Sequence, residues 1–341
     1  MQAIVQHKYG APETVLELQR LERPVVGDGD VLISVRAASV NPADWHIVRA
    51  SPPIVRLSGY GLRTPKNPVP GTDVAGVVEA VGRNVAGLRL GDEVIGWCRG
   101  AFAEFACAAE DHFVPKPANL SFEEAATVSL AGTTALQGLR DAGKLQTGQT
   151  VLIVGASGGV GTFAVQIAKT LGAEVTGVCS TRNVDMVKSI GADHVIDYTQ
   201  GDFTRGEQRY DLIFQLAGTR SPSDCRRALK PKGTLVLISG EGRFGGMDRI
   251  LRAKVASRFT SQRLVTFLVA ENKADLLVLG GLIAAGKVVP VIDRMYTMGE
   301  TPAAIRHVEA GHSRGKVVVT TRGPTAATDG VSAESSELLG V

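Results

Sequence analysis

A cluster of glycines follows directly on an apolar, β-branched run. The run is Val151 to Val154, and the glycines stand at Gly155, Gly158, Gly159 and Gly161. Glycines at these spacings permit a tight turn, let backbone N–H groups approach a pyrophosphate, and let a helix lie close against the preceding strand. A helix N-terminus in that place attracts phosphate charge. The pattern therefore predicts a dinucleotide clamp.

The end of the next predicted strand bears on which dinucleotide is bound. In folds that bind NAD, an acid about 20 residues beyond the glycines accepts hydrogen bonds from the ribose diol. Here the strand Glu174 to Cys179 runs into Ser180, Thr181 and Arg182. Two hydroxyls and a guanidinium can bind a 2′-phosphate, which favours NADPH over NADH. The alternative is that Arg182 is an ordinary exposed arginine in a turn.

Further cofactor contacts are expected where other strands end, because open α/β sheets bind ligands beyond the carboxyl ends of their strands. Tyr198 is placed to cover the adenosine, or else it is a surface tyrosine that caps the sheet. The predicted contacts in the glycine turn and at these strand ends are Gly155, Ser157, Gly158, Gly159, Val160, Gly161, Ser180, Thr181, Arg182, Tyr198, Gly218, Ser239 and Gly240.

Length, charge and cysteine content exclude several classes of protein. A chain of 341 residues is long enough for two domains. The net charge of +3 is spread along the chain, which argues against a nucleic-acid partner. The four cysteines form no CxxC pair, so neither a disulfide framework nor a zinc knuckle is expected. The start lacks an apolar leader and no apolar stretch is long enough to cross a bilayer, so we expect no membrane partner and a cytoplasmic location.

The pattern of elements changes near residue 120. Residues 1–120 contain short alternating strands separated by Gly, Pro and Asp, which is typical of an all-β domain. The proline-rich stretch from Ala50 to Pro70 has no clean period and is expected to be a long loop near a cleft. Residues 121–270 alternate helices and strands, which predicts a parallel, doubly wound sheet and hence an α/β fold.

The last part of the chain is predicted to return to the first domain. The strands Val288 to Ile292 and Lys316 to Thr321 follow a helix at Asn272 to Ala285, and we expect residues 271–323 to rejoin residues 1–120. The extended segment Arg263 to Val269 could be an edge strand that pairs with a second subunit, so a homodimer is expected. Residues 324–341 are small, polar and aperiodic, which predicts a disordered tail.

Several motifs in order resemble one family. Gly71 to Val78, Gly91 to Val94 and the glycine turn are similar to the medium-chain dehydrogenase/reductase superfamily. Ser39 to Asp44 and Gly132 to Ala135 resemble its zinc-independent quinone oxidoreductase branch, which includes zeta-crystallin. The resemblance implies a GroES-like β domain, a Rossmann domain and a cleft between them, frequently in a homodimer. It also implies that Lys316, after Arg314 and Gly315, lies near the nicotinamide, although these residues could equally form a basic turn.

The resemblance also implies that no catalytic zinc is bound. Zinc-dependent relatives carry ligands at positions that here read Asn41, Thr72 and Leu130. An amide, a hydroxyl and an aliphatic chain do not make a catalytic zinc site. Because no Lewis acid would stabilise a developing alkoxide, the preferred acceptor is a small hydrophobic, conjugated molecule, either a quinone or an enal or enone. Conjugation spreads the charge that hydride addition creates.

Three residues are candidates for the chemistry itself. The resemblance places Asn41 and Thr134 next to the nicotinamide and the substrate. Asn41 could instead satisfy loop backbone, and Thr134 could bond a preceding helix carbonyl. The order Asp44-Trp45-His46 resembles the place where zinc alcohol dehydrogenases carry a proton-relay histidine. An imidazole there could protonate the product, or else His46 is an exposed loop residue. Tyr60 is a weaker candidate for a proton donor.

The sequence therefore predicts an NADPH-dependent reductase of quinones or activated C=C bonds. Two alternatives stay open: a zinc-free NADP-dependent alcohol or carbonyl dehydrogenase, and a non-catalytic NADPH-binding protein.

Overall fold

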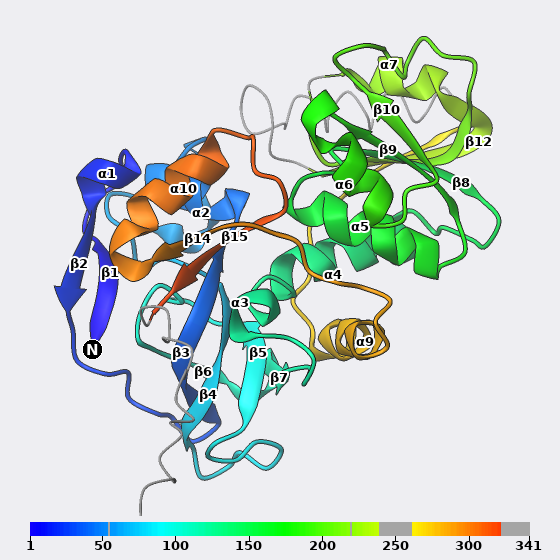
Figure 1. Ribbon diagram of the computed structural model, residues 1–341. Coiled ribbons are helices and arrows are strands. Elements are labelled where there is room, and N and C mark those ends of the chain that lie inside the picture. The colour runs from blue at the N-terminus through cyan, green and yellow to red at the C-terminus, as the bar shows by residue number, and fades with distance from the viewer. Residues whose placement is uncertain (54, 219, 239–260, 322–341) are drawn as a thin grey trace, which may run out of the picture.

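The structure is a computed structural model that describes residues 1–53, 55–218, 220–238 and 261–321. Ser239, Gly240 and the predicted tail 324–341 lie outside the described residues. The described part contains two large β-sheets and a short hairpin, and helices pack around and between them (Figure 1).

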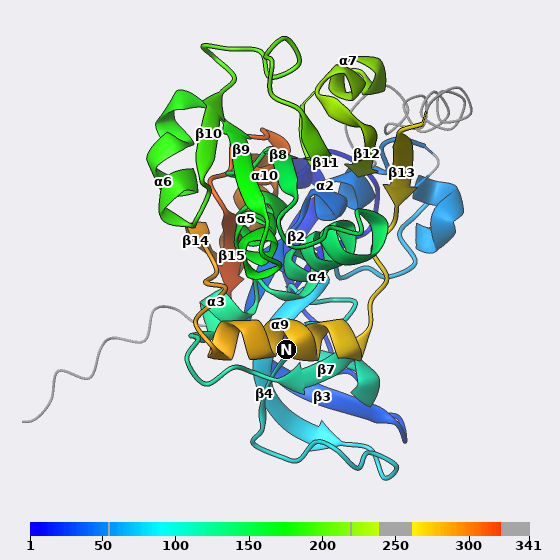
Figure 2. The same cartoon turned by 90° about the vertical axis from the view of Figure 1, so that its right-hand side faces the viewer.

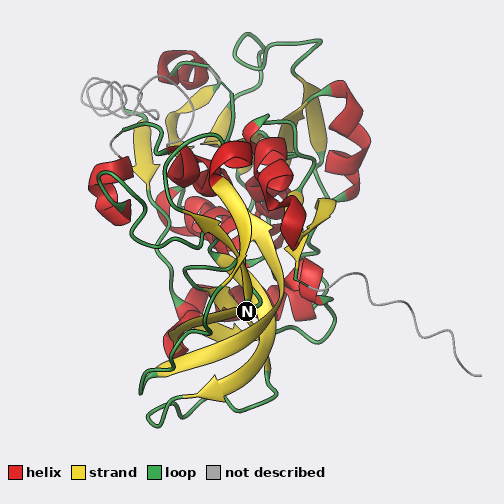
Figure 3. Cartoon of the chain, turned by 90° about the vertical axis from the view of Figure 1, so that its left-hand side faces the viewer, coloured by secondary structure: helices red, strands yellow, loops and turns green. Residues whose placement is uncertain are grey.

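The N-terminal sheet is mostly antiparallel, and β3 is its longest strand. The strands run in the order β14-β15-β3-β4-β5-β7, and β6 also pairs with β3. Figure 3 shows this sheet as the long twisted yellow strands. Its strands are β3 (Asp30–Val40), β4 (Asp73–Val81), β5 (Glu93–Trp97), β6 (Phe105–Ala109), β7 (Phe113–Pro115), β14 (Ile292–Thr297) and β15 (Lys316–Thr320), beside the hairpin β1 (Gln2–Gln6) and β2 (Leu16–Arg20).

The second sheet is parallel and six-stranded, in the order β10-β9-β8-β11-β12-β13. Renumbered from its first strand, this is the 3-2-1-4-5-6 order of a doubly wound dinucleotide-binding sheet. The predicted α/β fold is therefore confirmed. The strands are β8 (Thr150–Val154), β9 (Glu174–Cys179), β10 (His194–Asp197), β11 (Tyr210–Gln215), β12 (Leu229–Ile238) and β13 (Arg263–Phe267).

Helix α4 lies between the two sheets, and α9 crosses below it near β7 (Figure 2). Fully buried residues from both sheets and from α4 belong to one continuous hydrophobic cluster. Gly138, at the end of α4, illustrates how closely it is packed, because a Cβ there would lie 2.2 Å from Cζ of Phe214 in β11. The helices are α1 (Pro12–Val15), α2 (Pro42–Arg49), α3 (Phe122–Ala125), α4 (Ser129–Gln137), α5 (Gly159–Thr170), α6 (Val184–Ser189), α7 (Pro222–Arg227), α9 (Lys273–Ala284) and α10 (Thr301–Glu309).

The last described strand returns to the start of the chain. β15 pairs antiparallel with β3, with Val317 opposite Val40, and α10 packs on α2 (Figure 1). This register brings Lys316 next to Asn41, although 275 positions separate them in sequence. The tertiary fold thus joins two predicted site residues.

Some predicted strand limits were wrong. The strand expected at Val288 to Ile292 begins only at Ile292, because Pro290 lacks the N–H group that a ladder requires. The strand expected at Arg263 to Val269 ends at Phe267. The strands β2 and β6 were not predicted, and β6 consists largely of alanine, which gives little strand signal.

Candidate functional site

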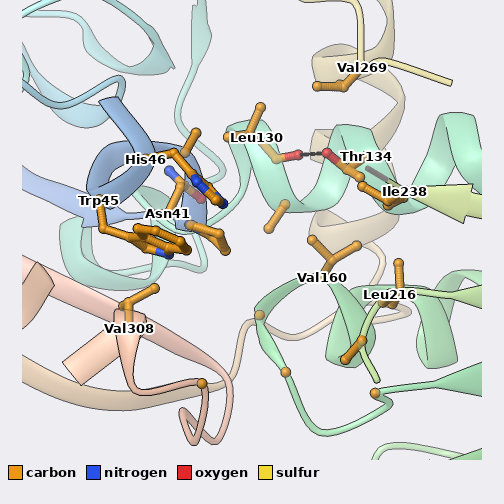
Figure 4. A pocket seen from close by; sticks show the side chains of 18 of the residues that line it. Asn41, Trp45, His46, Leu130, Thr134, Val160, Leu216, Ile238, Val269 and Val308 are labelled. Carbon is orange, nitrogen blue, oxygen red and sulfur yellow. Dashed lines mark hydrogen bonds between the residues drawn. The ribbon is translucent and has the colours of Figure 1, made fainter. Parts of the chain in front are cut away.

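A cavity of about 1110 Å³ lies between the two sheets. The Asn41 loop and α2 form one wall, α4 forms a second, and the glycine turn before α5 forms a third (Figure 4). Apolar side chains from the ends of β11, β12 and β13 close the remaining side. These side chains are Leu216, Leu237, Ile238, Phe267, Leu268 and Val269.

The glycine turn has the geometry that its spacing predicts. Gly155 adopts φ +89°, which favours glycine, and a Cβ on Gly161 would lie 2.1 Å from the Gly155 carbonyl oxygen. Gly158 is the N-cap of α5 and lines the cavity, and no side chain caps this helix. The first N–H groups of α5 are therefore available to a phosphate, so the turn fits a dinucleotide pyrophosphate.

The predicted adenosine end lies at the neighbouring strand ends. Thr181 donates to a carboxylate oxygen of Asp197 at 2.6 Å, and Arg182 donates to the His312 carbonyl at 2.8 Å. Ser180 and Ser157 both accept from the Asn183 amide, at 3.3 and 3.0 Å. The Asn183 amide therefore links Ser180 to Ser157 of the glycine turn.

Two other predicted contacts lie on different parts of this surface. Tyr198 follows β10 and is 58% exposed. Gly218 follows β11 and lines the cavity together with Val160 of the glycine turn. Ser239 and Gly240, the remaining predicted contacts, lie outside the described residues.

Asn41 is buried, and its side-chain amide is bonded at both ends. Its Nδ2 donates to Asp73 at 3.0 Å, and its Oδ1 accepts from the Lys316 ammonium at 2.5 Å. Asn41 lines the cavity, but these bonds direct the amide group toward Asp73 and Lys316. The contacts fix the orientation of the amide.

Asp73 and Lys316 form a buried ion pair with 3.6 Å between Oδ2 and Nζ. Burial raises the pKa of Asp73 and lowers the pKa of Lys316, and the attraction between the two charges opposes both shifts. Asp73 also accepts from Ser39 Oγ at 3.0 Å and from the Leu130 N–H at 3.1 Å. These donors favour the ionised carboxylate.

Thr134 and His46 face the cavity from opposite walls (Figure 4). The Thr134 hydroxyl donates to the Leu130 carbonyl at 2.6 Å, which is the helix bond that the sequence left open as an alternative. Nδ1 of His46 lies 2.6 Å from the Ser51 carbonyl, and its ring stacks on Trp45 with 3.5 Å between centroids. Because a carbonyl only accepts, Nδ1 carries a proton, and Nε2 is the acceptor in the neutral ring.

Sequence reasoning missed several residues at the cavity or next to it. Asp73 was read only as part of a family motif, although an acid that begins a buried strand is a signal worth following. Gln215 ends β11, where the strand-end rule could have found it. The other missed residues are Phe267, Val308 and Ser313.

Comparison with known proteins identifies the family. Residues 27–118 match the alcohol dehydrogenase GroES-like domain, and residues 190–319 match the zinc-binding dehydrogenase family. The chain is 33% identical to the mouse mitochondrial NAD(P)H oxidoreductase RTN4IP1 over 94% of its length and 89% of that protein. The chain belongs to the quinone oxidoreductase-like branch of the medium-chain dehydrogenase/reductase superfamily. Membership makes it an NAD(P)H-dependent oxidoreductase.

One further relative is similar to this chain in sequence, and one solved structure is similar to it in fold. A tomato 2-methylene-furan-3-one reductase is 32% identical, over 91% of this chain and 76% of that protein. The solved structure of a quinone oxidoreductase from Coxiella burnetii superposes with a TM-score of 0.84 at 32% identity and covers 94% of this chain and 99% of that one. The GroES-like domain and the Rossmann-type sheet expected from the sequence are confirmed.

One of the two matching families is described as zinc-binding, but the residues of this chain at the expected ligand positions do not fit a zinc ion. The positions expected to carry its ligands are Asn41, Thr72 and Leu130, and the Lys316 ammonium sits 2.5 Å from the Asn41 amide oxygen. A cation next to the Asn41 amide oxygen opposes a second cation there, and Leu130 offers no side-chain donor. Among the described residues, no group of three or more His, Cys, Asp or Glu side chains could hold a metal ion.

Asp44 supplies a pH-dependent contribution to stability. It accepts from the Asn41 backbone N–H at 2.7 Å, and burial, with a smaller effect of the Asp73 charge, raises its pKa to about 7 against the lowering effect of Lys316. The unfolded carboxyl titrates near about 4. Between these values the folded state retains a proton that the unfolded state releases, so this group favours folding at low pH and loses that effect as pH rises through 7.

We expect Asp44→Asn to remove this dependence. The free energy of unfolding of the wild type should fall relative to that of the variant by up to about 1.4 kcal/mol per pH unit between pH 5 and 7. Urea unfolding at pH 5, 6, 7 and 8 measures the difference. Asp92→Asn, at a half-buried acid that accepts the Arg89 N–H, is the control. Parallel wild-type and Asp44→Asn curves would contradict the assignment.

Proposed function

We propose that this oxidoreductase transfers hydride from NADPH to a quinone or to an activated C=C bond of an enal or enone, without zinc. The observation that carries the proposal is one cavity that joins a dinucleotide-type glycine turn to an apolar wall. Within the part of the chain that the structure describes, no group of three or more His, Cys, Asp or Glu side chains could hold a metal ion. Bound NADPH supplies the hydride. A conjugated acceptor spreads the resulting charge itself, so it requires positioning more than activation.

The cavity wall suits a small apolar acceptor. Val55 and Tyr60 from the long loop face the cavity along with the apolar strand ends. The tomato relative is named for reduction of a methylene-furanone, which is a conjugated C=C acceptor. That name supports an acceptor of this class for the present chain.

The chain's own residues would divide the work as follows. The glycine turn, Ser157 and Val160 would hold the pyrophosphate, and Ser180, Thr181, Arg182 and Tyr198 the adenosine end. Gly218 and Lys316 would lie at the nicotinamide end. Asn41 and Thr134 would define the position of the reacting groups, and His46, in its imidazolium form, would donate its Nε2 proton to the product directly or through a water.

A panel of acceptors tests the acceptor class. With NADPH, kcat/KM for cyclohexenone should exceed that for cyclohexanone by at least about 10²-fold, because the saturated ketone requires stabilisation that an oxyanion donor or Lewis acid normally supplies. 1,4-Benzoquinone should also react. The two cyclic ketones differ only in conjugation, so each controls for the size of the other.

Other outcomes of the panel would support the alternatives. Comparable turnover of cyclohexanone, or oxidation of secondary alcohols with NADP⁺, would favour a zinc-free alcohol or carbonyl dehydrogenase. NADPH binding without turnover of any acceptor would favour a non-catalytic nucleotide-binding protein.

Arg182→Ala tests the preference for NADPH. Loss of charge-assisted hydrogen bonds to a 2′-phosphate should raise the Kd for NADPH at least about tenfold and leave the Kd for NADH unchanged. Only one of its donors is used on His312, so others are available. Fluorescence titration of both nucleotides measures this, with exposed Arg89→Ala as the control. An equal effect on both nucleotides would remove Arg182 from 2′-phosphate recognition.

His46→Ala tests the proton donor. If His46 protonates the product, kcat should fall by about 10²-fold or more, and the solvent isotope effect on kcat should change. The measurement is the pH–rate profile in H₂O and D₂O with cyclohexenone. A profile and isotope effect equal to those of the wild type would exclude His46 from the reaction.

Assembly and location are also proposals. The outer edge of β13 has no partner strand within the described residues, and we propose that it pairs with a second copy, which light scattering can measure. No helix in the described part of the chain is long and apolar enough to cross a membrane. The cytoplasmic location stays a prediction, since the mouse relative is named as mitochondrial.

A further inference from the structure

Asp73 is completely buried and does not line the cavity, yet it contacts three residues that do. Those residues are Asn41, Leu130 and Lys316, and they belong to three different segments. Asp73 itself is the first residue of β4, opposite Ser39 in β3. The Asp73 carboxylate, which lies outside the cavity lining, therefore contacts the Asn41 loop, α4 and Lys316 at the same time.

The contact with Leu130 reaches the helix wall. Asp73 Oδ1 accepts from the Leu130 N–H in the first turn of α4, where backbone donors have no partner within the helix. A negative charge at this end also interacts favourably with the helix dipole. Thr134 lies one turn further along the same helix. The position of Thr134 relative to β4 is thus tied to Asp73.

The contact with Asn41 reaches the loop wall. Asp73 Oδ2 accepts from Asn41 Nδ2, and Lys316 donates to Asn41 Oδ1, so the amide is held between the carboxylate and the ammonium. Removing either charge removes one of the two bonds that hold the amide and leaves the other charge buried without its partner. Asn41 is the N-cap of α2, and Trp45 and His46 follow it on this helix, so their positions depend on that of Asn41.

Lys316 connects the cluster to the glycine turn. The Gly315 N–H donates to the Ser157 carbonyl at 2.9 Å, and a Cβ on Gly159 would lie 2.9 Å from Cδ of Lys316. The Lys316 side chain therefore lies against Gly159 in the turn that would hold the pyrophosphate and also donates to Asn41 in the loop wall of the cavity.

We propose that Asp73 and Lys316 act together as positioning residues that set the separation of the Asn41 loop, α4 and the glycine turn, and so align the reacting groups for hydride transfer. This inference rests on the proposed function. Hydride transfer depends steeply on geometry, and a displacement of about 1 Å can cost about 10²-fold in rate. Asp73 does not line the cavity, so it affects alignment only through the residues that it contacts.

The test is a double-substitution cycle with Asp73→Asn, Lys316→Met and both together. Each single variant should lower kcat with cyclohexenone about 10- to 100-fold, with KM for the acceptor changed less than about threefold. Because the two residues act as one unit, the double variant should be about as slow as either single variant. The primary isotope effect with 4-deuterated NADPH should rise as hydride transfer becomes rate-limiting.

Asp211, a partly buried carboxylate in the other sheet, offers a matched control. Asp211 accepts from the Thr150 N–H, from the Thr150 hydroxyl and from Lys230. Asp73 likewise has a backbone, a hydroxyl and a lysine partner, and it has the Asn41 amide donor in addition. Neither Asp211 nor these partners of Asp211 line the cavity. Asp211→Asn and Lys230→Met should lower the unfolding midpoint and leave kcat per folded molecule unchanged. A purely structural role for Asp73 would give this same result.

A readout without turnover separates this proposal from the proposed function. The chain has two tryptophans, and Trp97 is only 1% exposed, so acrylamide quenching reports mainly on Trp45 at the cavity wall. Asp73→Asn should increase quenching and Asp211→Asn should not. Equal quenching and an unchanged kcat, or rate effects that multiply in the double variant, would overturn the positioning role. A wild type that reduces no conjugated acceptor overturns the proposed function, and the quenching result then decides the positioning role alone.

Discussion

The contact on which this structure depends is the one between the Lys316 ammonium and the Asn41–Asp73 pair. Two charges and an amide are taken out of water at the junction of both sheets, and that desolvation is costly. The cost is offset because nearly every polar atom has a partner: Asp73 accepts four contacts, and Asn41 is bonded at both ends. Such a cluster holds one arrangement, since any shift leaves a buried charge unpaired.

Two of the positions at which zinc-dependent relatives are expected to carry ligands, Asn41 and Leu130, contact Asp73 in this cluster. A metal ion brings together ligands from several segments and also withdraws electrons from the substrate. The Lys316–Asp73 pair can do the first of these through its contacts with β3, β4, β15 and α4. The Lys316 ammonium already interacts with the Asn41 amide and the Asp73 carboxylate, so it has little capacity to withdraw electrons from a substrate. This division agrees with the proposed conjugated acceptor, which needs positioning more than activation.

The two ends of the cavity differ in chemical character. Its walls next to the glycine turn are backbone, and its walls away from the turn are apolar side chains from three strand ends. A phosphate-bearing, charged ligand suits the first part, and a flat apolar molecule suits the second. Excluding water from the apolar part strengthens the electrostatic effect of the few polar groups that face it.

The sequence alone determined the fold class and the glycine turn, because both depend on local patterns: β-branched runs, helix periods and residues that tolerate a positive φ. It also named Asn41, Thr134, His46 and Lys316 one by one, partly through a family resemblance. Only the tertiary structure decided how these residues meet. The register of β15 against β3 sets Lys316 on Asn41, and the position of α4 sets Leu130 on Asp73. Contacts across such distances in sequence leave no periodic signal, because they arise from packing of whole sheets and helices.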